Sequence, residues 1–135
     1  MNKNIVSASI DSFNTFKLSN KGVKMPLTLP DGTPTKEFLI VCGSSSKKFM
    51  SKRSEYNQRR LEIAKMRAEQ KAKAEEELED LNRGLVAVLI VGWSFDEECN
   101  ETNVKKFLYD APQIQAQVDT FAGDYSNFFT KPPSN

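Results

Sequence analysis

Four acidic side chains lie close together in the last third of the chain: Asp96, Glu97, Glu98 and Glu101. Carboxylate oxygens are the ligands that hard cations such as Ca²⁺ prefer. The segment nevertheless lacks the fixed ligand positions and the turn glycine of an EF-hand loop. An exposed acidic loop explains these residues better than a cation site, and we expect no metal here.

Other groups that perform chemistry are scarce. The chain has no histidine, the commonest general base and metal ligand, and neither Cys42 nor Cys99 lies in a CxxC pair. GxSxG, P-loop and GxGxxG motifs do not occur. The sequence therefore predicts a protein that is not an enzyme and needs no cofactor. Without a secretory signal we expect reduced cysteines, although the sequence leaves a disulfide open.

Two polar segments are candidates for binding anions. Ser44, Ser45 and Ser46 precede a helix-forming stretch, where serines act as N-caps and also contact phosphate. The basic residues that follow are Lys47, Lys48, Lys52, Arg53, Arg59, Arg60, Lys65 and Arg67. Acidic residues at every seventh position interrupt them, and the net charge of the whole chain is only +1. We therefore expect no nucleic-acid binding and keep it as a minor alternative.

The elements that position these residues predict an α+β fold that is mainly α. Residues 1–22, rich in Asn, Ser and Lys, are expected to form a flexible N-terminal segment. Residues 23–43 predict a β-hairpin, because two β-rich runs flank the turn residues Pro30-Asp31-Gly32-Thr33-Pro34. Pro26 makes the first strand an edge strand, since proline cannot donate to a sheet.

Residues 44–83 predict one long charged helix, since residues 47–82 contain neither glycine nor proline. Ten basic and three acidic residues occupy positions 47–73, and five acids follow at positions 75–80. This segregation suits association between ends of opposite charge, or self-association into an oligomer. A solvated helix whose charges only keep it soluble is the alternative.

Residues 84–130 predict a small helical module, and residues 131–135 a tail. The apolar run from Leu85 to Trp93 is about half of the ~20 residues that cross a bilayer, so we expect no membrane span. The run favours a continued helix, with a strand as the competing interpretation. Thr102 is the predicted N-cap of a helix over residues 103–109, and Pro112 suits the first turn of another.

The order and spacing of several segments are informative together. They are the turn Leu29-Pro30-Asp31-Gly32-Thr33-Pro34, a strand at residues 38–41, a Gly-Ser-Ser-Ser step into the charged helix, an apolar run closing at Trp93, the stretch Glu101-Thr102-Asn103-Val104-Lys105-Lys106-Phe107-Leu108, Pro112-Gln113-Ile114, and a terminal aromatic at Phe128 or Phe129. This series resembles the tail assembly chaperones of long-tailed bacteriophages, with Pro26 as a departure from the pattern.

The resemblance implies a role without bond chemistry. Such chaperones bind the tape-measure protein, keep it soluble and help the tail-tube protein to polymerise around it. They act in the host cytoplasm and are absent from the mature virion. In many relatives a frameshifted longer product contacts the tail-tube protein, and this chain is expected to be the shorter product. A structural or adaptor protein of the tail is the alternative.

Five apolar residues are the expected anchors for a client helix laid in a groove: Trp93, Phe107, Ile114, Phe121 and Phe128. Each of them also suits the core of the module itself, which is the more common place for such side chains. We expect Trp93 and Phe128 to be the partly exposed ones.

Overall fold

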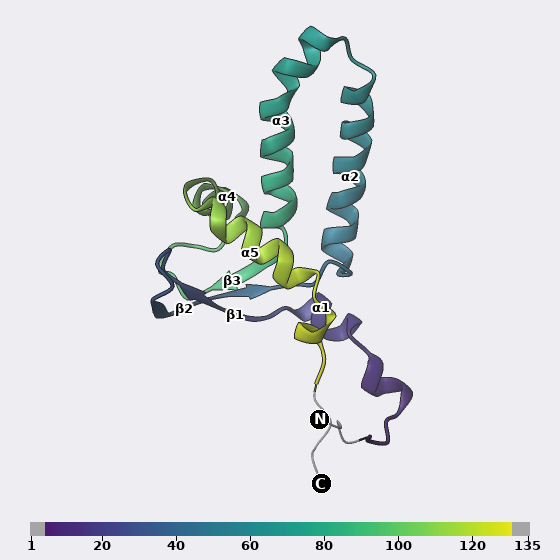
Figure 1. Cartoon of the computed structure of the whole chain (residues 1–135), viewed down its shortest axis with the longest axis vertical. Helices are drawn as coiled ribbons and strands as arrows, with labels where there is room; N and C mark the ends of the chain where they lie inside the picture. The colour runs from purple at the N-terminus through teal and green to yellow at the C-terminus, as the bar shows by residue number, and fades with distance from the viewer. Residues whose placement is uncertain (1–4, 131–135) are drawn as a thin grey trace.

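A computed structural model describes residues 5–130, and Figure 1 shows its arrangement. A small sheet lies at the base, two short helices cover it, and a pair of longer helices projects from it as a stalk. The α+β class, mainly α, is confirmed. The elements in chain order are η1 (Ile10–Phe13), α1 (Phe16–Lys21), β1 (Val23–Thr28), β2 (Pro34–Val41), α2 (Lys47–Ala64), α3 (Ala68–Ala87), β3 (Ile90–Trp93), α4 (Glu101–Asp110), α5 (Pro112–Ala122) and η2 (Tyr125–Phe128).

The predicted hairpin forms the first two strands of an antiparallel sheet with the order β1-β2-β3. Pro26 lies on β1, at the edge of the sheet, as the missing N–H requires. The connecting turn places Gly32 at φ +90°, and the Thr33 N–H donates to Asp31 Oδ1 at 2.9 Å. Local turn chemistry therefore sets the register of the hairpin.

The apolar run beyond residue 84 is partly helix and partly strand, the two structures that the sequence left open. Helix α3 continues to Ala87, and the chain then becomes strand β3, which pairs with β2 through Leu39 opposite Trp93. The β-branched residues at positions 90 and 91 suit a strand once a partner edge is available. None of the helices in the described range is long and apolar enough to cross a membrane.

The single long helix predicted for residues 44–83 is wrong. The chain reverses at residues 65–67, so α2 and α3 lie antiparallel as the stalk in Figure 1. A continuous helix would leave its apolar stripe in water, whereas the hairpin buries Ile63 and Ala74 between its two arms. No glycine or proline marks the reversal, because tertiary packing and not a local breaker decides it.

One ion pair joins the basic half of this region to its acidic block within the stalk. Arg59 on α2 donates from Nε and Nη2 to the two carboxylate oxygens of Glu77 on α3, at 2.8 and 3.0 Å, and from Nη1 to Glu62 at 2.9 Å. These hydrogen bonds from the guanidinium hold the pKa of Glu77 below its ordinary value. Arg59 of the basic half thus pairs with Glu77 of the acidic block in its own chain.

The N-terminal segment is more ordered than the sequence predicted. Flexibility was expected for residues 1–22, but η1 and α1 are helical, and α1 packs against η2. Ser19 on α1 is buried, its Oγ lies 3.0 Å from that of Ser45, and its carbonyl accepts the Gly43 N–H. Residues 1–4 of this segment and the predicted tail at residues 131–135 lie outside the described range.

The start of α2 is held by a residue from α1. Ser46 occupies the N-cap position but its side chain makes no capping hydrogen bond, and Asn20 Oδ1 instead accepts the Lys47 N–H at 2.9 Å. The serine step is therefore packed against α1 and does not present three free hydroxyls to an anion.

Gly22 gives a test of how α1 joins the sheet. Gly22 and Gly32 both have φ near +90°, but a Cβ at Gly22 would lie 2.9 Å from Ile40 Cγ2, whereas one at Gly32 meets nothing within 4 Å. Both alanine variants carry the backbone strain, and only Gly22→Ala adds overpacking. We expect Gly22→Ala to cost about 1–3 kcal/mol more than Gly32→Ala in chemical denaturation. Equal losses would contradict the close packing at residue 22.

Candidate partner-binding surface

Three aromatic side chains form a cluster beside the end of the sheet. The ring centroid of Trp93 lies 5.3 Å from that of Phe95 and 5.9 Å from that of Phe107, and the Phe95 and Phe107 centroids are 5.4 Å apart. All three pairs are edge-to-face, the favourable arrangement for aromatic rings. Each side chain is half-buried, so the cluster, which we call the aromatic surface, is partly open to a partner.

Local structure on both sides holds these rings in place. Trp93 ends β3, and its indole N–H donates to the carbonyl of Glu97 at 2.7 Å, which joins the acidic loop to the edge of the ring. Phe107 projects from α4, whose N-cap is Asn100 and not the predicted Thr102. The Asn103 N–H donates to Asn100 Oδ1 at 2.8 Å. The helix therefore begins two residues earlier than expected.

A hollow of about 300 Å³ adjoins the aromatic surface. Its lining consists of Phe95, Glu97, Asn103, Lys106, Phe107 and Asp110. The Lys106 ammonium lies 3.4 Å from Asp110 Oδ2, so the acidic loop supplies most of the uncompensated charge around the hollow. The site offers an apolar floor with an acidic rim.

The acidic loop itself brings no ligand set together. Within residues 5–130 no group of three or more acidic or cysteine side chains is placed to hold a metal ion. The Glu98 carboxylate accepts from Asn100 Nδ2 at 3.2 Å, and its carbonyl accepts from Asn103 Nδ2 at 2.8 Å. The loop thus shapes the start of α4.

The structure separates the five predicted anchors. Trp93 and Phe107 meet in the aromatic surface. Ile114 and Phe128 are 4% and 1% exposed, so the expected partial exposure of Phe128 is wrong. Phe121 is half-buried, stacks edge-to-face on Phe128 at 5.8 Å, and lines a separate groove between α5 and β1. Whether any of the five contacts a partner stays a prediction.

Phe95 is the member of the aromatic surface that sequence reasoning missed. Its position two residues after Trp93 carried a signal, because side chains at i and i+2 of an extended segment point to the same side. The four acids around it favoured a simple exposed loop, which hid that signal.

The two thiols lie apart from this surface and are free. Cys42 is buried in the core and Cys99 is half-buried. Burial raises the pKa of both thiols, which keeps them protonated and poor nucleophiles.

The fold and the surface together define a small α+β protein with a partly exposed aromatic surface. A family model described as "Phage tail assembly chaperone" matches residues 15–128, and the chain belongs to that family. The family is not one of enzymes. Neither a search of curated proteins nor one of solved structures gave a match.

Proposed function

We propose that this protein binds the tape-measure protein of its phage, keeps it soluble and promotes polymerisation of the tail-tube protein around it. Membership in the chaperone family supports the general role. The observation that carries the finer proposal is the aromatic surface, where three large rings pack against one another and remain only half-buried. Rings of this kind are typical anchors of protein interfaces.

The chemistry of the surface suggests the form of the client segment. A long helical client exposes apolar stripes that aggregate unless another protein covers them. One apolar side chain of such a stripe fits the hollow beside Phe107, and Lys or Arg residues flanking it meet Glu97 and its acidic neighbours. We therefore expect the preferred client segment to be an amphipathic helix with basic flanks.

The remaining parts of the proposal concern where and with what the protein works. Action in the host cytoplasm before the virion is complete follows from a role in assembly, as does contact with the tail-tube protein, directly or through an extended product. A structural or adaptor role in the tail differs in one measurable outcome, since it places the chain in finished particles.

Co-expression with the tape-measure protein tests the proposal. We expect the tape-measure protein to move from the insoluble to the soluble fraction and to elute with this chain in size-exclusion chromatography. Expression with an unrelated long helical protein of similar length is the control for general solubilisation. An insoluble tape-measure protein with no complex would contradict the proposal, and stoichiometric amounts of the chain in washed particles would favour the structural role.

A further inference from the structure

A segment at the N-terminal end exposes four large apolar side chains. Ile5, Val6, Ile10 and Phe13 are 100%, 65%, 95% and 76% exposed. The segment, residues 5–13, stands away from the body below α1 in Figure 1, and we call it the arm. Part of it has a defined shape, because Ser9 and Ser12 form a capping box around η1. So much apolar surface on an ordered arm is unfavourable in water unless something covers it.

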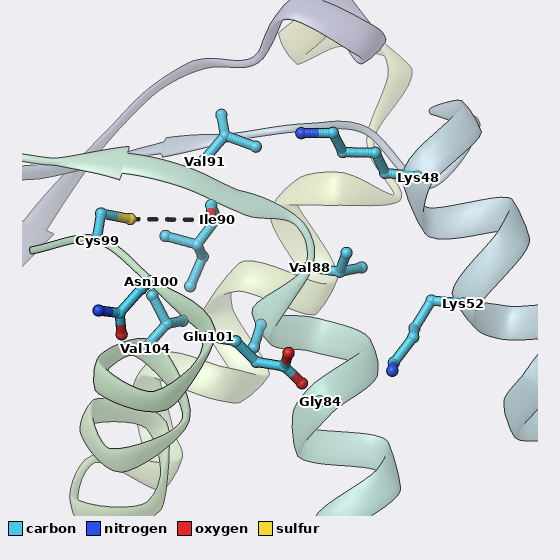
Figure 2. A pocket seen from close by; sticks show the side chains of 11 residues that line it. Lys48, Lys52, Gly84, Val88, Ile90, Val91, Cys99, Asn100, Glu101 and Val104 are labelled. Carbon is cyan, nitrogen blue, oxygen red and sulfur yellow. Dashed lines mark hydrogen bonds between the residues drawn. The ribbon is translucent and has the colours of Figure 1, made fainter.

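The body offers a cleft that suits such an arm. It lies where α2, α3, β3 and the start of α4 meet, and has a volume of about 300 Å³. Figure 2 shows Lys48 and Lys52 extending from α2 on one wall and Glu101 on the opposite side. Apolar side chains that also line the cleft include Val88, Ile90 and Val104.

Gly84 keeps this cleft open. A Cβ at this position of α3 would meet only Lys52 Cε, at 4.0 Å. Helix interiors disfavour glycine by about 1 kcal/mol relative to alanine. Glycine at position 84 thus leaves space in the cleft. A larger side chain would fill this space and would also strengthen the helix.

Charge complements the apolar match. Asp11 is the one charged residue of the arm, and it lies between Ile10 and Phe13. Among the described residues Lys48 has no ion-pair partner and Lys52 pairs only with Glu55, at 3.5 Å on the exposed side of α2. In a docked arm the Asp11 carboxylate would face the ammonium groups of Lys48 and Lys52, with the Glu101 carboxylate on the opposite wall.

We propose that the arm of one copy docks into the Lys48–Lys52 cleft of a second copy. Because the arm and the cleft are different surfaces, each copy inserts its own arm into one neighbour and receives the arm of another. The contact is therefore head-to-tail. Repetition of such a contact gives a ring or an open chain of subunits. The proposal concerns self-association alone, and does not depend on which client the aromatic surface binds.

Two complementary variants test the proposal on the protein itself. Deletion of residues 2–13 removes the arm and keeps the cleft, whereas Gly84→Leu fills the cleft and keeps the arm. We expect the full chain to grow in mass with concentration in size exclusion with light scattering, and each variant alone to stay monomeric. Mixed together they should form a 1:1 heterodimer that grows no further. Gly84→Ala is the matched control and should assemble as the full chain does.

Other outcomes overturn the proposal. The first is a full chain that stays monomeric at every concentration, and the second is self-association that survives either change. The third is a mixture of the two variants that forms no heterodimer, which would place the arm on its own body or on another partner. Circular dichroism confirms that both variants are folded. Asp11→Asn should weaken association by up to about fivefold, the range of an exposed ion pair.

Discussion

Phe128→Ala is expected to lower the free energy of unfolding by about 3–5 kcal/mol, the usual cost of removing a fully buried phenylalanine. Phe128 is 1% exposed and stacks on Phe121. It lies in η2, which contacts both α1 and α5, so its ring secures the C-terminal turn to the N-terminal helix. The loss should appear as a lower midpoint in urea, measured by circular dichroism.

The next residue supplies the control for this prediction. Phe129 has the same side chain but is 40% exposed, and truncating it removes much less buried surface. We expect Phe129→Ala to cost less than about 1 kcal/mol, as surface substitutions usually do. Similar losses for the two variants would show that η2 does not dock as described.

The elements that sequence reasoning predicted well are those with local signals. The hairpin follows from Asp31 and Gly32 in its turn, and α5 begins at Pro112, where the missing N–H of proline has no cost. These signals act within a few residues and need no knowledge of the rest of the fold. The end of the apolar run was harder, because a β-branched run becomes a strand only when β2 offers an edge.

The stalk shows why the rest was not predictable. No breaker residue occurs at positions 65–67, and helix propensity favours a continuous rod. The reversal depends on contacts between residues far apart in sequence, such as Arg59 with Glu77. Opposite charges in the two halves were visible in the sequence and suited attraction, with a solvated helix as the alternative. They did not reveal that the two halves belong to one folded hairpin.

The residues of the candidate site were likewise predicted only in part from the sequence. Trp93 and Phe107 were predicted as anchors, and the structure brings them together. The sequence could not separate them from Ile114 and Phe128, because helical spacing of apolar residues is the same for a core and for an interface. Only the packing of α5 and η2 decides that the latter two are covered.

Phe107→Ala is expected to weaken binding of the tape-measure protein by about 30-fold or more, the effect of losing a residue that dominates an interface. The Phe107 ring contacts both other rings of the aromatic surface and lines the adjacent hollow, so its loss removes the floor on which a client side chain would rest. The affinity is measured by calorimetry or fluorescence anisotropy with a soluble client fragment, at a temperature where the variant remains folded.

Tyr109→Ala on the same helix is the matched control, since its ring is 67% exposed and stacks on Arg83 away from the aromatic surface. We expect it to change the affinity by less than about threefold, as for most residues outside the energetic centre of an interface. Phe95→Ala, in the loop, gives a second variant with little effect on the helices and should weaken binding as Phe107→Ala does. Unchanged affinity in both phenylalanine variants would place the client elsewhere, because a client on this surface cannot avoid both rings.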